Sequence, residues 1–343
     1  MNHHRRGTGS PIVLIHGIGS RWQVWNPILA RLAEHHEVIA LDLPGFGASA
    51  PDDAIADISD AGFAVPSDAG MAVTSDPGMA VTSDPGMAVT SDPGMAVTSD
   101  PGMAVTSDPG MAVTTDGGMA AASGAGIAGA DGRPERVSGG GLSGTGSVPQ
   151  LADRVGEFLT ELGVERPTIG GSSLGGGVAL ELARRGVARS VVAFSPVGFF
   201  GAVGAAWCRT VVSAARAGGT TLSPALPRLF ATRAGRVALC GVFYGHPAAL
   251  APEDCLADAR ALVTAPGFAT ARRRLGEWRV TSAITGVPIT IAWGDRDLVL
   301  PRRQARRARQ VLPNARHVRL PGCGHLPFAD DPEACARLLL EAA

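Results

Sequence analysis

The 343-residue sequence contains no lysine, since all 30 of its basic residues are arginine. This absence excludes Schiff-base lysines, Ser-Lys dyads and the lysine of nucleotide-binding P-loops. Cysteine is also scarce. The five cysteines are widely spaced and form no CxxC pair, so they indicate neither a zinc site nor redox chemistry, and we expect small, mostly buried thiols.

Long apolar runs are missing as well. No stretch of 18 or more apolar residues occurs, and the first ten residues lack the apolar core of a signal peptide. The sequence therefore predicts a cytoplasmic protein without a membrane partner.

Charge is divided unevenly along the chain. Residues 50–147 carry 13 acidic residues against Arg133 and Arg136, whereas the remainder carries 28 arginines against 18 acids. A basic remainder is compatible with anionic substrates or nucleic acid. Because no aromatic-interleaved basic stripe accompanies it, solvated helices such as 302–309 are the simpler interpretation, and no nucleic-acid partner is predicted.

The acidic stretch is a low-complexity repeat. The octapeptide MAVTSDPG begins at Met71 and recurs every eight residues up to Met103, with looser copies on either side. A proline in every unit excludes a continuous helix. The composition predicts a disordered insertion over 51–147, and the alternative is a narrow β-solenoid. Two roles are considered for the repeat: an inert expansion, or an acidic segment that partly covers the entrance of an active site.

The flanking sequence alternates between short β-branched runs and helical spacing, which predicts a mostly parallel sheet covered on both faces. Residues 201–285 are mostly helical and predict an inserted cap. The predicted core domain is therefore 11–50, 148–200 and 286–343. Strands are expected at 11–17, 36–45, 166–172, 189–196, 287–294 and 315–322, and helices at 148–163, 175–186 and 302–312.

A G-x-S-x-G segment centred on Ser173 follows one of these strands and opens a helix, which is the context of a nucleophile elbow. Only Ser173, and not Ser172, fits that register. The alternative is that the glycines merely pack a helix or cradle a phosphate. It is weaker, because G-x-G-x-x-G is absent here and the chain has no lysine.

The remaining parts of a serine-dependent site follow in order. HGIG after the first strand predicts an oxyanion hole from the N–H groups of Ile18 and Leu174, with His16 in a structural role. Asp295 and Asp297 end a later strand, and His325 lies on a late loop. The histidine would accept the Ser173 proton while an aspartate fixes its tautomer.

Five motifs together resemble the α/β-hydrolase fold superfamily: HGxG at 16–19, DLPGFGxS at 42–49, GxSxGG at 171–176, GxxDxxxP at 294–301 and GxGH at 322–325. The resemblance implies that fold and selects Asp297, leaving Asp295 as the alternative acid. The family normally has two strands before HGxG. Either this sheet is shortened to about six strands, or the assigned start of the chain lies too late.

These features predict a serine hydrolase that forms an acyl-enzyme from an ester, thioester or related carbonyl bond of a small apolar molecule, without metal or cofactor. A C-C bond hydrolase, an acyltransferase or a perhydrolase would use the same residues. A non-catalytic scaffold that displays the repeat is the alternative from another class. The cap aromatics either line a pocket or pack in a core: Phe199, Phe200, Trp207, Phe230, Phe243, Tyr244 and Trp278. The sequence does not indicate an oligomeric state.

Overall fold

A computed structural model describes residues 1–51, 146–281 and 284–343. The predictions of disorder or of stacking for the octapeptide repeat fall outside the described residues.

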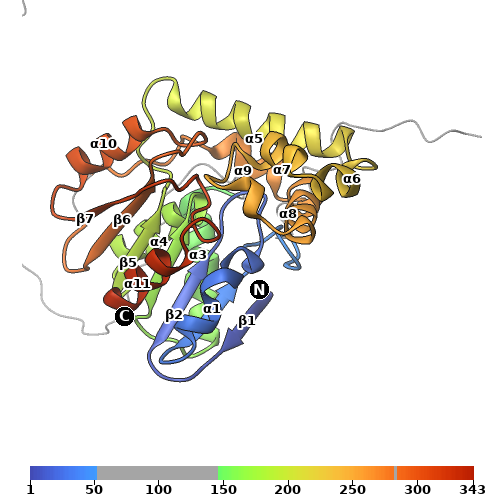
Figure 1. The fold of residues 1–343 in the computed structure, drawn as a ribbon. Helices are drawn as coiled ribbons and strands as arrows, with labels where there is room; N and C mark the ends of the chain where they lie inside the picture. The colour runs from blue at the N-terminus through green and yellow to red at the C-terminus, as the bar shows by residue number, and fades with distance from the viewer. Residues whose placement is uncertain (52–145, 282–283) are drawn as a thin grey trace, which may run out of the picture. The chain divides into compact units, whose positions relative to one another are not determined.

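In the described part of the chain, seven strands form one sheet in the order β1-β3-β2-β4-β5-β6-β7. All neighbours are parallel except β1 and β3, so the predicted mostly parallel sheet is confirmed (Figure 1). The strands are β1 (His3–Arg6), β2 (Pro11–Ile15), β3 (Glu37–Leu41), β4 (Thr168–Ser172), β5 (Ser190–Phe194), β6 (Ile289–Gly294) and β7 (Arg316–Leu320).

The expectation of about six strands was wrong, because β1 adds a seventh. This strand reads HHRR and offers no apolar alternation to a sequence-based prediction. It pairs antiparallel with β3 at the edge of the sheet, where polar and charged side chains are tolerated. The ring of His4 stacks on Trp22 at 4.4 Å between centroids, and His3 meets Phe158 edge-on at 5.1 Å.

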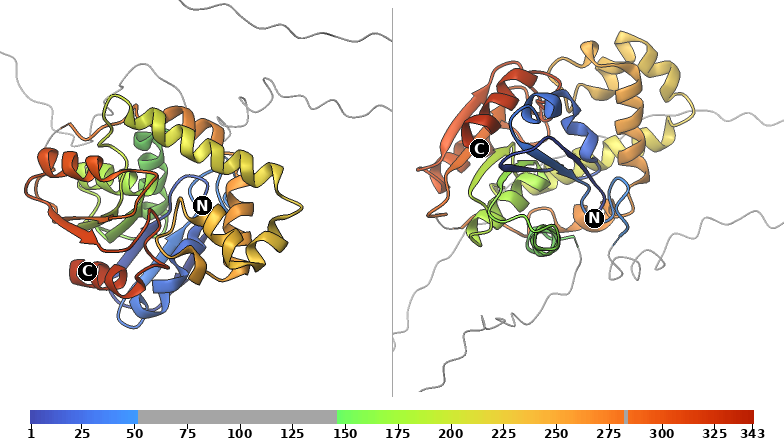
Figure 2. Two further views of the ribbon diagram at one scale, coloured as in Figure 1. Left: turned by 45° about the horizontal axis from the view of Figure 1, so that its top comes forward. Right: turned by 90° about the horizontal axis from the view of Figure 1, so that it is seen from below.

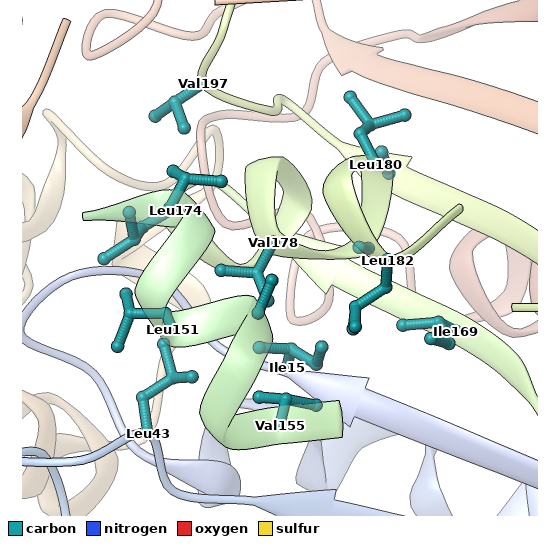
Figure 3. Close-up of a cluster of buried hydrophobic side chains, with 14 of the residues drawn as sticks. Ile15, Leu43, Leu151, Val155, Ile169, Leu174, Val178, Leu180, Leu182 and Val197 are labelled. Carbon is teal, nitrogen blue, oxygen red and sulfur yellow. The ribbon is translucent and has the colours of Figure 1, made fainter. Parts of the chain in front are cut away.

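Helices cover both faces of the sheet. Helices α1 (Asn26–Leu32) and α11 (Pro332–Ala342) pack on one face, and α3 (Val148–Glu161), α4 (Leu174–Arg184) and α10 (Arg302–Val311) pack on the other (Figure 1). Successive side chains of β2 alternate between these two layers, with Val13 and Ile15 in one core cluster and Ile12 and Leu14 in the other. Figure 3 shows the layer that contains Val13 and Ile15, where Leu151 of α3 and its neighbours pack beside α4.

Between β5 and β6, the described residues form five α-helices. They are α5 (Gly204–Thr221), α6 (Leu226–Ala231), α7 (Arg233–Cys240), α8 (Pro252–Thr264) and α9 (Phe268–Arg274). Figures 1 and 2 place α5 to α8 together beyond one end of the strands. Leu226, Phe230, Cys240 and Cys255 form a small core of their own among α6, α7 and α8.

Across the described ranges, every helix is too short or too polar to traverse a bilayer. The five cysteines are all buried free thiols.

Candidate active site

Ser173 occupies a sharp turn between the end of β4 and the start of α4. Its backbone has φ 53° and ψ −113°, a conformation that residues with a side chain rarely adopt. Three hydrogen bonds hold the turn. The Ser173 N–H donates to the Phe194 carbonyl at 2.9 Å, and the Ser173 carbonyl accepts from Gly177 at 3.1 Å and from Val197 at 3.0 Å.

The glycines of the motif are required by close backbone approach. A Cβ on Gly171 would collide with the carbonyl of Gly175, and a Cβ on Gly175 would collide with the carbonyls of Ile15 and His16. The strand-to-helix turn therefore brings α4 against β2 so tightly that no side chain fits there. This explains the G-x-S-x-G spacing in physical terms.

The two adjacent serines have different surroundings. Ser172 is fully buried, and its hydroxyl has no hydrogen-bond partner in the described part of the chain. Ser173 lines a cavity of about 410 Å³, which is also lined by Gly17, Ile18 and His325. Only Ser173 is thus placed to meet a bound molecule.

Most of the cavity wall is apolar and comes from α5 to α8, including Val212, Leu226, Leu239 and Leu262. Of the seven aromatic residues expected to line a pocket or pack in a core, Phe230, Phe243 and Tyr244 line the cavity. The other four lie elsewhere: Phe199 and Phe200 are buried in the main core, Trp207 is 46% exposed, and Trp278 donates to Glu181 at 3.3 Å.

His325 and Asp297 form a buried pair, each about 4% exposed. His325 Nδ1 lies 2.9 Å from Asp297 Oδ2, while Asp297 Oδ1 accepts from the N–H groups of Val299 and Leu300 at 2.9 and 2.8 Å. Because an ionised carboxylate only accepts hydrogen bonds, the pair places the ring proton on Nδ1 and leaves Nε2 as an acceptor.

Among the described residues, no hydrogen bond joins the Ser173 hydroxyl to His325, although both line the same cavity. In the absence of substrate, the donor–acceptor distance of such a hydrogen bond is often long.

Asp295, the alternative acid, does not contact His325. Its carboxylate accepts from the Gly322 N–H at 2.8 Å, and its own N–H donates to Leu320 at 3.1 Å. It lines a different cavity of about 390 Å³ beside α10. Asp295 therefore braces the loop that carries His325.

The two N–H groups expected to form an oxyanion hole are free of other partners. Within residues 1–51, 146–281 and 284–343, neither Ile18 N–H nor Leu174 N–H donates to another protein atom. Gly17 approaches Ser173 so closely that a Cβ there would lie 3.0 Å from Ser173 Cβ. Leu174 is buried and directly follows Ser173, and Ile18 is half-buried and lines the Ser173 cavity, so both unpaired donors lie near the serine.

His16 is fully buried and structural. Its Nδ1 donates to the Gly17 carbonyl at 2.7 Å, and its Nε2 accepts from the Leu43 N–H at 3.0 Å. Burial lowers the pKa of His16 and keeps the ring neutral. Nearby, the Asp42 carboxylate accepts from Asn2 at 2.6 Å and from Trp22 at 2.7 Å, and a Cβ on Gly47 would collide with it.

Asp330 was missed by the sequence prediction. Its buried carboxylate accepts from the N–H groups of Gly245 and Gly324 at 2.7 and 2.8 Å, and from His246 N–H at 2.8 Å. It ties the His325 loop to the segment after α7. Nothing in the sequence distinguishes Asp330 from Asp331, which caps α11 through the Ala334 N–H.

This difference gives a stability prediction. Asp330→Asn replaces one acceptor oxygen by a donor that faces other donors, and we expect it to lower the free energy of unfolding by about 1–3 kcal/mol. Asp331→Asn is the matched control, because asparagine caps helices as well as aspartate does. Urea unfolding followed by circular dichroism measures both. Equal midpoints for the two variants would contradict the role of Asp330.

Comparisons with known proteins agree with the observed fold. A model of the alpha/beta hydrolase family matches residues 12–338. The fold is similar to that of a thermophilic esterase from Thermogutta terrifontis, with a TM-score of 0.58 and 18% identity, covering 99% of this chain and 91% of that one.

Curated relatives match over shorter stretches. The chain is 39% identical over 59 residues to (E)-2-((N-methylformamido)methylene)succinate hydrolase of Acinetobacter baylyi, covering 17% of this chain and 22% of that protein. It is 43% identical over 49 residues to 2-hydroxy-6-oxo-2,4-heptadienoate hydrolase of Pseudomonas putida, covering 13% and 18%. The matches thus span only a small part of each of these two relatives.

Proposed function

The chain belongs to the alpha/beta hydrolase family, and we propose that it is a serine hydrolase acting on an ester, thioester or related carbonyl bond of a small, largely apolar substrate. One observation carries the proposal. Ser173, on its strained turn, shares a mostly apolar cavity with His325, whose ring is fixed by the buried Asp297.

The proposed mechanism assigns each group one task. Ser173 Oγ attacks the substrate carbonyl carbon as its proton passes to His325 Nε2, and Asp297 stabilises the imidazolium. The N–H groups of Ile18 and Leu174 bind the oxyanion. His325 then protonates the leaving group. The resulting acyl-enzyme is hydrolysed by a water that gives its proton to the same nitrogen.

A second candidate is a C-C bond hydrolase, because one matching relative is a 2-hydroxy-6-oxo-2,4-heptadienoate hydrolase. Such a reaction would need the same nucleophile, base and oxyanion donors. Acyltransfer and perhydrolysis differ from ester hydrolysis only in the molecule that receives the acyl group.

A substrate panel tests the proposal. Purified protein is offered p-nitrophenyl esters from acetate to octanoate and, separately, a vinylogous diketone. We expect ester turnover that rises with acyl length while the chain still fits the cavity, because apolar burial favours binding. Turnover of the diketone alone would select the C-C hydrolase. Turnover of none of these, with an unreactive Ser173, would favour the non-catalytic scaffold.

A further inference from the structure

A polar pair interrupts the apolar wall of the Ser173 cavity. Tyr244, the only tyrosine in the chain, follows α7, and Asp258 lies on α8. Both line the cavity with Ser173, and the Tyr244 hydroxyl donates to Asp258 Oδ2 at 2.9 Å. Neither residue belongs to the set that carries out the proposed bond cleavage.

One carboxylate oxygen of Asp258 takes no part in this hydrogen bond. Within the described residues, Asp258 Oδ1 accepts no hydrogen bond, and its nearest cation is Arg21 Nη2 at 3.9 Å. The side chain is 33% exposed, and it lines both the Ser173 cavity and a smaller one of about 100 Å³. Oδ1 lies on the side of the carboxylate toward Arg21, which lines the smaller cavity, and the carboxylate as a whole keeps vacant acceptor positions.

The Tyr244–Asp258 pair carries a desolvation cost at this position. Burial raises the pKa of Asp258, and burial together with the neighbouring Asp258 charge raises the pKa of Tyr244. An apolar pair of similar shape would satisfy the packing among α6, α7 and α8 without a partly buried carboxylate. Stability alone therefore does not account for a lone carboxylate and hydroxyl in this wall.

The charge at the pair indicates what it binds. A free carboxylate oxygen requires a hydrogen-bond donor, which excludes carboxylate and ketone groups as its direct partner. The guanidinium of Arg21 already lies near Asp258 and partly balances its charge. A neutral donor, the hydroxyl, fits that balance better than an ammonium group.

We propose that Asp258 and Tyr244 form a subsite for a substrate hydroxyl, so that the preferred substrate is an ester or related carbonyl compound whose apolar chain carries a hydroxyl group. This inference rests on the proposed hydrolase function. The hydroxyl donates to a vacant acceptor position of the Asp258 carboxylate, while the rest of the chain lies against the apolar wall.

The test compares p-nitrophenyl octanoate with a series of p-nitrophenyl hydroxyoctanoates in which the hydroxyl moves along the chain. For one position or two adjacent positions, we expect kcat/KM to rise about 10- to 100-fold above that of octanoate, mainly through KM, as for a hydrogen bond to a charged group. In the double variant Asp258→Leu with Tyr244→Phe, the ratio should fall to about 1. Glu253→Gln, on the exposed first turn of α8, is the control and should keep the wild-type ratio.

The outcomes separate the two proposals. Octanoate turnover that depends on Ser173, without a hydroxyl preference at any position, would overturn the subsite and leave the hydrolase intact. Calorimetric binding of the same ester pairs to Ser173→Ala needs no turnover, so equal Kd values there would also overturn the subsite. Loss of all ester turnover in the wild type would overturn the hydrolase instead. The wild-type comparison stands even if the double variant does not fold.

Discussion

Replacing Ser173 with alanine is expected to lower kcat/KM for the best ester substrate by roughly 10⁴-fold or more, because the variant has no nucleophile to form an acyl-enzyme. The residual rate would come from the oxyanion donors and from substrate binding. Alanine also lacks any group that could form another covalent intermediate. Steady-state kinetics on a p-nitrophenyl ester measures the effect.

Ser172→Ala is the matched control for this experiment. The Ser172 hydroxyl is buried without a hydrogen-bond partner among the described residues, so its removal should change kcat/KM by only a few fold. Circular dichroism of both variants checks that each is folded. Activity lost in Ser172→Ala but kept in Ser173→Ala would reverse the assignment of the nucleophile.

Asp297→Asn is expected to lower kcat by about 10⁴-fold while the protein stays folded. The carboxylate accepts from His325 Nδ1 at 2.9 Å and also from two backbone N–H groups. An amide that keeps its oxygen on those N–H groups presents its NH₂ group to the histidine. The ring then carries its proton on Nε2 and cannot accept one from Ser173.

Asp295→Asn distinguishes between the two aspartates of this loop. The Asp295 carboxylate accepts only from the Gly322 N–H within the described ranges, and an asparagine oxygen can do the same. We therefore expect kcat to remain within a few fold of wild type. A large loss in Asp295→Asn, with little in Asp297→Asn, would contradict the proposed orientation of His325.

The sheet and its order of elements were accessible from sequence because they depend on local patterns. The largely apolar runs that became β2, β3, β5 and β6 are buried, and buried parallel strands read as continuous hydrophobic segments. The turn at Ser173 was also predictable, since Gly171 and Gly175 reflect a steric need within a few residues. β1 was missed because its HHRR sequence is polar and its pairing with β3 is its main support.

The rest of the site depends on contacts between distant segments. Asp330 gains its role from Gly245, 85 positions away, and Asp258 Oδ1 lies 3.9 Å from Arg21 Nη2, on a segment that precedes the repeat. No spacing rule links such pairs. The same holds for the cap aromatics, where composition alone does not separate Phe230, which lines the cavity, from Trp207, which is exposed.

The most direct test of the central claim is the position of a covalent adduct. Wild-type protein is treated with a fluorophosphonate, digested, and analysed by tandem mass spectrometry, with Ser173→Ala and Ser172→Ala treated in parallel. With Ser173 as the nucleophile, we expect one adduct per chain, on Ser173. It should be present in the wild type and in Ser172→Ala and absent from Ser173→Ala. An adduct on any other residue, or labelling that persists in Ser173→Ala, would contradict this assignment.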